Sequence, residues 1–260
     1  MDLRLKGNTA LITGGSRGIG RAVAELLAAE GCNLVLTSRS AADLEAARAA
    51  VTEKSAVSVR TIAADLSDSA TVARLVKEAP EIDILINNAG AIPGGVLTAV
   101  DEPTWRAAWD LKVYGTINMT RAYYPIMKAR GGGVVVNVIG NAALTRDPGS
   151  ICVVTANAGL TAFTQSLGSS SLNDGIRVNG VNPGPIATDR QIVRNSKKAQ
   201  EQFGDASRWP EYFKSLPGGR IGEPAEVAAM IAFLASPLSD FTSGVVIALD
   251  AGQSARSGPT

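Results

Sequence analysis

The sequence predicts a single α/β domain: a doubly wound parallel sheet of about seven strands with helices on both faces. Short, strongly apolar runs such as Ile82–Ile86 alternate with longer helical patterns along the chain. Strands this apolar, spaced by helices, are typical of a parallel sheet whose two faces are covered. A glycine-rich turn, Gly14–Gly20, lies directly between the first apolar run and the first helical pattern. This order of strand, turn and helix is typical of nucleotide-binding sheets.

The composition indicates one domain with a sizeable core. No linker-like stretch divides the 260 residues, so residues 1–260 are expected to form a single domain. Apolar residues make up 45% of the chain and charged residues 19%, as in soluble globular proteins. The net charge is +1 and no basic cluster stands out. Neither nucleic acid nor an anionic membrane is therefore an expected partner.

Targeting, membrane and metal-binding signals are not found in the sequence. The N-terminus lacks a signal-peptide pattern, and no apolar run approaches the length of a membrane span. Cys32 and Cys152 lie far apart without metal-ligand spacing, and two buried thiols are favoured over a disulfide. The chain has no histidine, which excludes histidine triads and histidine metal sites. A reduced, cytoplasmic setting without a metal is expected.

The glycine-rich turn is the motif around which the other predictions are organised. A short apolar run beginning at Thr9 leads into Gly14, Gly18 and Gly20, and a helical pattern follows at once. Glycines let the backbone approach a pyrophosphate, and the free N–H groups at the helix start face the anion. The alternative is a plain turn between a strand and a helix. The spacing of the three glycines, preceded by Thr13, favours a phosphate-binding loop.

Strands and helices alternate through the first half of the chain. Apolar segments predict strands, and alanine-rich or periodic segments predict helices. The elements expected after the first helix are a strand over Asn33–Ser38, a helix over Ala41–Thr52, a strand over Val57–Ala63, a helix over Ala70–Ala79 and a strand over Ile82–Ile86.

The second half continues the alternation, with one polar interruption. The expected elements are a long helix over Pro103–Met127, a strand over Val134–Val138, a helix over Ile151–Leu172, a strand over Ile176–Val181, a helix over Pro224–Ala235 and a strand over Gly244–Leu249. A turn is expected at Asn182–Pro185. Residues 187–217 are polar and lack clear periodicity, so they are expected to form a mobile lid of helical pieces over the site.

Polar segments at the ends of the strands mark the expected ligand site. In open parallel sheets, ligands bind beyond the carboxyl ends of the strands. Four segments of the first half fall there: Thr13–Gly20, Ser38 with Arg39, Asp65 with Leu66, and Asn87–Gly90.

With these motifs in place, the chain resembles the classical, single-domain short-chain dehydrogenases/reductases over nearly its whole length. The motifs that carry the resemblance are Thr13–Gly20, Asp65-Leu66, Asn87–Gly90, Asn182–Thr188 and Arg220–Pro224. The resemblance implies a Rossmann-like fold, an NAD(H) or NADP(H) cofactor, a small-molecule substrate and a homotetramer or homodimer. The helices over Pro103–Met127 and Ile151–Leu172 would form the main subunit interface.

The resemblance also implies a set of cofactor-binding residues, each at the carboxyl end of a strand. They are Gly14, Ser16, Gly18 and Gly20 at the pyrophosphate, Ile19 beneath the cofactor, Asp65 and Leu66 at the adenine, Asn87, Ala89 and Gly90 at the ribose, and Pro183, Gly184, Ile186 and Thr188 at the nicotinamide. Thr188 and the Ile186 backbone would hold the carboxamide. The alternative for each is an ordinary loop residue.

The choice between the two cofactors rests on the end of the second strand. Members of the family that prefer NAD place an acidic residue there to bind the ribose hydroxyls. This chain has Ser38 and Arg39 instead, and Arg17 lies in the glycine turn. Planar guanidinium groups match phosphate geometry, which favours NADP(H), with NAD(H) as the alternative. Arg39 could also be a solvated surface residue, and Arg17 a residue that only caps the loop.

The catalytic positions are where the chain departs from the family. The family uses a serine, a Tyr-x-x-x-Lys pair and an asparagine from the preceding long helix. The matching positions here are Gly140, Val153, Asn157 and Lys112 respectively. No tyrosine lies between residues 124 and 212 and no lysine between residues 128 and 197, so no shift of the alignment restores the motif. The usual proton-transfer groups are therefore expected to be missing.

At two of these positions the family's asparagine and lysine are exchanged. Lys112 stands at the asparagine position and Asn157 at the lysine position, so one ammonium and one carboxamide remain. A partly buried ammonium can titrate near neutrality, and Lys112 could then act as an acid, a base or an oxyanion stabiliser. Alternatively, Lys112 extends to solvent or pairs with a carboxylate such as Asp110 of a neighbouring subunit. Cys152 has no activating base and is not expected to be a nucleophile.

The leading hypothesis is an NADP(H)-binding oxidoreductase that acts by hydride transfer on an unidentified carbonyl compound or alcohol, with Lys112 and Asn157 as its tentative catalytic residues. Lys112 is expected to point inward, toward Asn157. The alternatives are a catalytically inactive nucleotide-binding pseudoenzyme and a non-redox enzyme on the same fold. Fold alone does not separate these functions.

Overall fold

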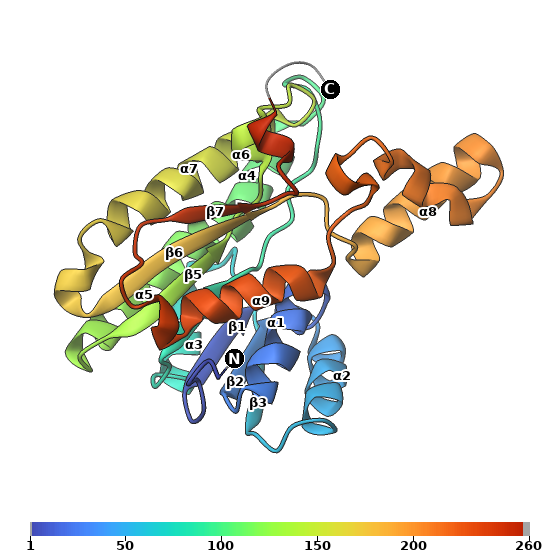
Figure 1. Cartoon of the computed structure of the whole chain (residues 1–260). Helices are drawn as coiled ribbons and strands as arrows, with labels where there is room; N and C mark the ends of the chain where they lie inside the picture. The colour runs from blue at the N-terminus through green and yellow to red at the C-terminus, as the bar shows by residue number, and fades with distance from the viewer. Residues whose placement is uncertain (1, 257–260) are drawn as a thin grey trace.

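The computed structural model describes residues 2–256 and contains a seven-stranded, wholly parallel sheet, as the sequence predicts (Figure 1). Its strands lie in the order β3-β2-β1-β4-β5-β6-β7. Their bounds are β1 Thr9–Thr13, β2 Asn33–Ser38, β3 Val59–Ala63, β4 Ile84–Asn87, β5 Gly133–Val138, β6 Ile176–Pro183 and β7 Val246–Leu249. Ala10 on β1 lies beside Leu34 on β2 and Ile84 on β4. The strand order reverses between β1 and β4, which opens the crevice where such sheets bind ligands.

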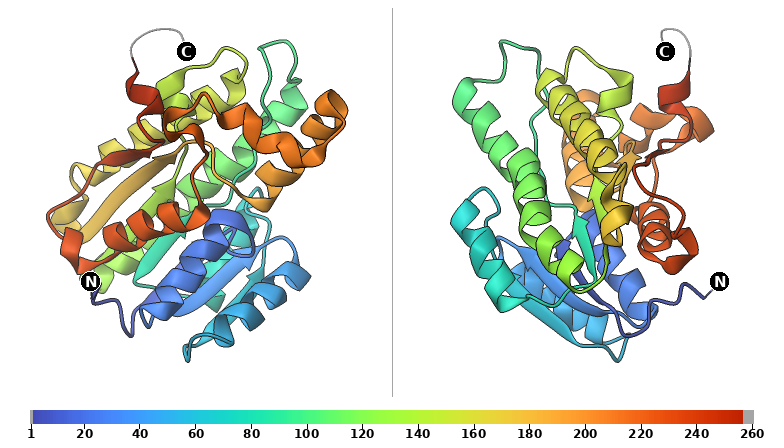
Figure 2. Two further views of the ribbon diagram at one scale, coloured as in Figure 1. Left: turned by 45° about the vertical axis from the view of Figure 1, so that its right-hand side comes forward. Right: turned by 90° about the vertical axis from the view of Figure 1, so that its left-hand side faces the viewer.

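Helices cover both faces of the sheet (Figure 2). One face carries α1 (Gly18–Ala29), α2 (Ala41–Thr52) and α9 (Pro224–Ala235). The other carries α3 (Ser69–Glu78), α5 (Gly115–Ala129) and α7 (Ile151–Gly168). Short elements complete the described chain: α6 Ala142–Thr145, η2 Ser171–Asp174, η4 Pro217–Gly219, η5 Pro237–Ser239 and η6 Gln253–Ala255. Among the described residues, no helix is both long and apolar enough to cross a membrane.

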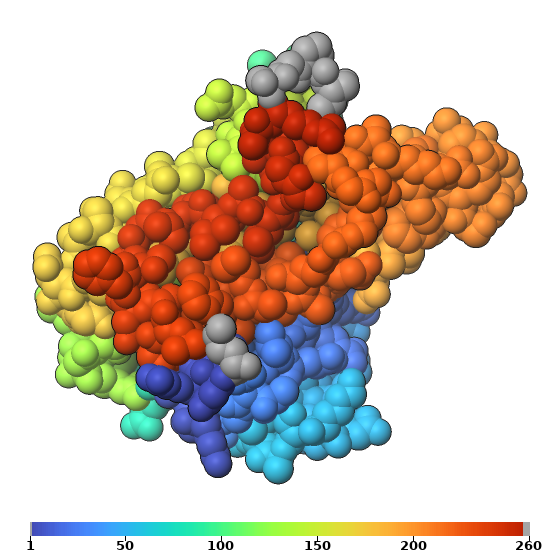
Figure 3. All heavy atoms as spheres, viewed as in Figure 1, coloured from blue at the N-terminus to red at the C-terminus, as the bar shows by residue number. Residues whose placement is uncertain are grey.

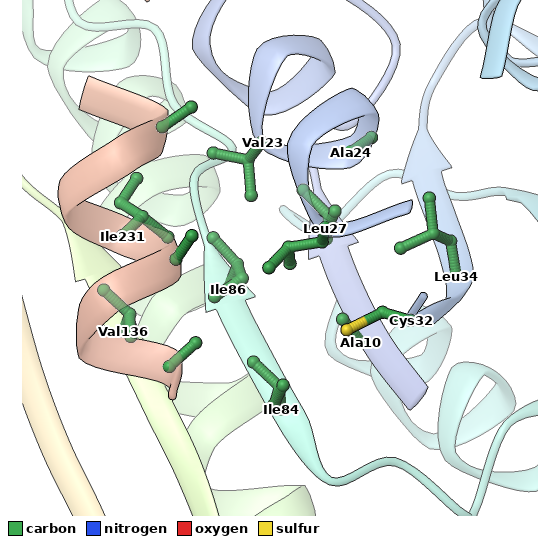
Figure 4. Packing of buried hydrophobic residues seen from close by; sticks show 14 of the residues in the cluster. Ala10, Val23, Ala24, Leu27, Cys32, Leu34, Ile84, Ile86, Val136 and Ile231 are labelled. Carbon is green, nitrogen blue, oxygen red and sulfur yellow. The ribbon is translucent and has the colours of Figure 1, made fainter. Parts of the chain in front are cut away.

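Two apolar layers hold the helices to the sheet. Figure 4 shows Val23 and Leu27 of α1 and Ile231 of α9 directed at Ile86 on β4. Burying a side chain of this size typically contributes about 1.5–3 kcal/mol, so these contacts fix α1 and α9 against the strands. The layer on the other face includes Tyr123, which is fully buried and donates its hydroxyl to Ala79 O at 3.0 Å. Both cysteines are buried and free, as predicted.

The predicted long helix over Pro103–Met127 is wrong in one important respect, because the structure divides it into three parts. α4 (Glu102–Trp109) continues into a π-helical turn, η1 (Asp110–Tyr114), and then into α5. A π-turn inserts one residue into the helical repeat and often occurs at functional sites. The apolar pattern of the sequence does not distinguish this turn from an α-helix, and the turn contains Lys112.

Smaller corrections concern where elements end. The helix predicted over Ile151–Leu172 stops at Gly168, where an added Cβ would lie 2.4 Å from the Gly244 backbone. β6 runs on through Asn182 and Pro183, which the sequence analysis placed in a turn, because both pair with β7. The strands predicted to begin at residues 57, 82 and 244 begin two residues later, and α3 is shifted one residue toward the N-terminus.

The segment over residues 187–217 is more regular than the sequence predicted. α8 (Asp189–Phe203) is a 15-residue helix, and η3 (Ala206–Phe213) packs against it. The residues that α8 buries include Asn195 and Ala199, so its inner face carries little apolar signal and the helical period was missed. α8 and η3 together, here named the α8 arm, project from the body of the molecule (Figures 1 and 3).

Candidate active site

A cleft of about 780 Å³ lies at the carboxyl ends of β1, β4, β5 and β6. The glycine turn, the loop after β4, the π-turn, the end of β5 and the start of the α8 arm form its walls. The lining residues are Gly14, Arg17, Gly18, Ile19, Asn88, Ala89, Gly90, Lys112, Val138, Ile139, Gly140, Pro183, Thr188, Asp189, Arg190, Val193 and Arg194. The tertiary structure thus brings together segments from both halves of the chain, as the strand-end argument predicted.

The glycine positions of the turn leave little or no space for a side chain. Gly14 and Gly18 have φ angles of +64° and +54°, which favour glycine. A Cβ on Gly20 would lie 2.2 Å from Gly14 O, and one on Gly18 would lie 3.0 Å from Thr188 Cγ2. α1 begins at Gly18, so its free N–H groups face the cleft. The turn therefore has the geometry of an anion-binding loop.

Thr13 and Asn88 connect the glycine turn to the loop after β4. The Thr13 hydroxyl accepts hydrogen bonds from the backbone N–H groups of Asn88 and Ala89, both at 2.9 Å. The Asn88 amide donates to Thr13 O at 2.9 Å and to Gly14 O at 3.1 Å. Asn88 was missed by the sequence analysis, although it stands inside the Asn87–Gly90 motif, because a motif does not say which of two adjacent side chains faces the site.

Asn87 faces the core instead of the cleft. Asn87 is 3% exposed, and its side-chain amide donates to Thr120 Oγ1 at 3.0 Å and to Asn137 Oδ1 at 2.9 Å. Asn137 in turn donates to Thr164 Oγ1 at 2.8 Å. Among the described residues, Asn87 Oδ1 has no hydrogen-bond partner. The side chain therefore links β4 to β5 and α5, and only the backbone of Asn87 is left for a contact with a ligand.

A second, smaller recess of about 230 Å³ adjoins the cleft at the end of β2. It brings together Arg17, Ser38, Arg39 and Leu66, along with Ser16, and no carboxylate lines it. Arg39 makes no ion pair within residues 2–256. The recess is therefore positively charged.

Two carboxylates lie close to this recess without lining it. Arg17, whose side chain is 70% exposed, donates to Asp43 Oδ1 at 2.7 Å. Asp65 accepts hydrogen bonds from the Ser67 N–H and hydroxyl, and these hold the pKa of Asp65 below its usual range. Leu66 is buried, whereas Asp65 is exposed beside the recess.

Lys112 lies in the wall of the cleft and points inward, as the sequence analysis predicted. Its Nζ donates to Asn157 Oδ1 at 2.8 Å and to the carbonyl oxygen of Ile139. Burial among protein atoms lowers the pKa of Lys112 to about 8, since desolvation disfavours the charged form. An ammonium has three N–H donors, and these two bonds leave the third available to the cleft.

Gly140 and Asn157 fit one another. Gly140 has a φ of +124°, and a Cβ there would lie 2.9 Å from Asn157 Nδ2. Asn157 is 2% exposed; its amide donates to Gly140 O at 3.2 Å while its oxygen accepts from Lys112. The Gly140 N–H donates to Asn182 Oδ1 at 3.2 Å. Lys112, Asn157, Gly140 and Asn182 therefore form one connected hydrogen-bond chain between the π-turn, α7 and β6.

The other residues of α7 near this chain carry no reactive group into the cleft. Val153 is half-buried and does not line the cleft. Cys152 is buried, and burial raises the pKa of its thiol, so the reactive thiolate is disfavoured.

The residues expected at the nicotinamide are divided between two places. Pro183 and Thr188 line the cleft, and Thr188 caps α8 by accepting from Gln191 N at 3.3 Å. Ile186 lines a separate recess and pairs with Gly222. Gly184 lies against Asp250 and does not line the cleft.

Replacing Gly140 with serine is expected to destabilise the protein by about 1–3 kcal/mol, because a side chain is strained at this φ. The new Cβ would also press on the Asn157 amide. The free energy of unfolding in urea measures the loss. Gly131→Ser is the control: its φ is +91°, and nothing lies within 4 Å of its Cβ position. Equal losses in the two variants would contradict the contact between Gly140 and Asn157.

The chain is similar in sequence to known proteins over almost its whole length. Residues 14–254 match the family described as enoyl-(acyl carrier protein) reductase. The chain is 30% identical to a 3-oxoacyl-[acyl-carrier-protein] reductase FabG of Aquifex aeolicus, over 97% of this chain and 99% of that protein. It is 33% identical to a galactitol 2-dehydrogenase (L-tagatose-forming) of Cereibacter sphaeroides, over 96% of each chain.

Solved structures agree in fold over the full length. A short chain dehydrogenase/reductase family protein superposes with a TM-score of 0.85 at 36% identity, covering 98% of this chain and all of that one. L-sorbose reductase from Gluconobacter frateurii, solved as a complex with NADPH and L-sorbose, gives a TM-score of 0.91 at 30% identity and covers 99% of this chain and all of that chain.

Proposed function

This chain belongs to the short-chain dehydrogenase/reductase family, and on that basis we propose that it is an NADP(H)-dependent oxidoreductase with an altered active site. Its substrate would be a carbonyl compound or the corresponding alcohol. The family assignment supports a nicotinamide cofactor in general. The preference for NADP(H), the residues that bind it and the proton donor are parts of the proposal.

The residues of the cleft and of the smaller recess at the end of β2 fit such a cofactor. The glycine turn offers N–H groups at the start of α1 for a pyrophosphate, where any Cβ on Gly20 would collide with Gly14 O. The smaller recess offers Arg17, Ser38 and Arg39 for a 2′-phosphate, and no carboxylate lines it to bind ribose hydroxyls instead. When bound, the nicotinamide would supply the hydride.

The proposed mechanism depends on the position of the Lys112 ammonium in the wall of the cleft. Its Nζ makes two hydrogen bonds to the protein, and Lys112 lines the cleft, so we expect the third N–H to meet a substrate there. In carbonyl reduction, that N–H donates a proton to the substrate oxygen, and the resulting neutral amine recovers a proton from water. Asn157 and the Ile139 carbonyl hold Nζ in place throughout. Groups positioned in this way typically contribute 10²- to 10⁴-fold to a rate.

The proposal is tested by titrating the protein with NADPH and NADH and then following NADPH oxidation with a panel of carbonyl compounds. Tighter binding of NADPH and consumption of at least one carbonyl support it. Binding without turnover over a broad panel would favour a nucleotide-binding pseudoenzyme, and binding of neither cofactor would reject the proposal.

The pH dependence of turnover should report on Lys112. Because the protonated amine is the acid, the rate of carbonyl reduction should fall as pH rises through about 8. The reverse oxidation needs the neutral amine, so its rate should rise through the same range. Single-turnover rates of reduction and of oxidation, measured between pH 6 and pH 10, test both expectations. If neither rate changed with pH, this role of Lys112 would be contradicted.

Three broader features complete the proposal. The α8 arm would act as a lid, since it projects from the body and the residues at the start of α8 line the cleft.

The family resemblance supports a homotetramer or homodimer built on α4, α5 and α7. We also propose a cytoplasmic location.

A further inference from the structure

The α8 arm directs a row of three residues into the cleft. Arg190, Val193 and Arg194 all line it, and their spacing places them on one face of α8. Val193 is 68% exposed, which is high for an apolar residue on a helix that buries its opposite face against η3. The free face of α8 is therefore the face that a ligand in the cleft would meet.

The two arginines on this face have no carboxylate partner within residues 2–256. Arg208 and Arg220, which lie further along the same region, each pair with a glutamate at 2.7–3.0 Å. Arg194 instead donates to Gln191 Oε1 at 2.8 Å, a bond within its own helix that holds the guanidinium. Its remaining N–H donors are free for a ligand.

Arg190 and Arg194 differ in which recess they reach. Arg190 lines both the cleft and the smaller recess with Arg17 and Arg39. Arg194 lines only the cleft, one helical turn or about 6 Å further along the axis of α8. Among the cleft residues, only Asp189 is acidic. The phosphates of the cofactor would engage Arg17 and Arg190 but leave Arg194 unmatched.

Resting on the proposed function, we propose that the substrate carries an oxyanion, foremost a carboxylate, which Arg194 binds from the α8 arm. The substrate is an acidic carbonyl compound whose carbonyl lies at Lys112 and whose apolar portion packs on Val193 and Ile139. A planar guanidinium binds a carboxylate or a phosphate through paired N–H donors, which gives both affinity and orientation.

The test measures dissociation constants by calorimetry on the protein loaded with NADP⁺, which cannot reduce the probes. Two pairs of probes separate the anions: 4-oxopentanoate against its methyl ester, and dihydroxyacetone phosphate against dihydroxyacetone. Wild type should bind the charged member of one pair roughly 10- to 100-fold more tightly than the neutral member. Preference within the first pair identifies a carboxylate, and preference within the second alone identifies a phosphate.

Two variants locate the effect. Arg194→Met should remove the preference for the charged probe while leaving NADPH binding unchanged, whereas Arg190→Met should weaken NADPH binding. Lys197→Met is the matched control, because Lys197 lies on the same side of α8 beyond the cleft and faces Glu201. Equal binding of charged and neutral probes by wild type, or a preference that survives in Arg194→Met, overturns the inference. Turnover of neutral carbonyls alone would overturn it and leave the proposed function standing.

Discussion

Replacing Lys112 with methionine is expected to lower the rate of carbonyl reduction by at least about 100-fold, because the substrate oxygen loses its proton donor. The apolar stem of methionine fills the same space, so the free energy of unfolding should change little. Single-turnover oxidation of bound NADPH measures the effect apart from product release. Lys128→Met is the control and should retain the wild-type rate, because Lys128 is an exposed lysine of α5 that pairs with Asp174 on η2.

The same position should also affect cofactor binding. An ammonium about 6 Å from the nicotinamide would disfavour the cationic, oxidised ring by roughly 3 kcal/mol at an effective dielectric of 20, before solvent screening. Lys112→Met should therefore narrow the preference for NADPH over NADP⁺. Lys112→Arg separates the two roles, since arginine keeps the charge but does not release its proton at these pH values. If Lys112→Met left both turnover and cofactor preference unchanged, the role of Lys112 would be rejected.

Exchanging Arg39 for aspartate is expected to reverse the cofactor preference, with a change of at least about 100-fold in the ratio of NADPH to NADH affinity. Wild type should favour NADPH because Arg39 and Arg17 face a recess that no carboxylate lines. In the variant, aspartate would repel a 2′-phosphate and could accept hydrogen bonds from the two ribose hydroxyls of NADH.

Fluorescence titration with both cofactors measures the reversal. Arg48→Asp is the control, because it introduces the same charge change on α2 at an exposed residue that does not line the recess. If wild type bound NADH more tightly, the interpretation of the end of β2 would be wrong. The ion pair between Arg17 and Asp43 would then be the first feature to reconsider, because it turns one edge of the Arg17 guanidinium toward a carboxylate.

Local sequence patterns were sufficient to predict the fold class and the edge of the sheet at which the cleft lies. Alternating apolar and helical segments are local patterns, and β2, α2 and α9 occur over the ranges that the patterns predicted. The carboxyl ends of parallel strands share one edge of the sheet, so the glycine turn, the end of β2 and the loop after β4 had to meet. The spacing of Gly14, Gly18 and Gly20 was enough to predict a tight turn before α1, because a glycine requirement arises from the local backbone.

Tertiary structure decided which side chains face the cleft. Asn87 and Asn88 are adjacent and identical in type, yet the packing of β4 against β5 directs Asn87 into the core and leaves Asn88 at the glycine turn. The π-turn that holds Lys112 has the apolar pattern of an α-helix, so its position was not visible in the sequence. The row of Arg190, Val193 and Arg194 was missed because α8 buries a weakly apolar face against η3. In each case the orientation depends on contacts between segments distant in the chain, which local periodicity does not encode.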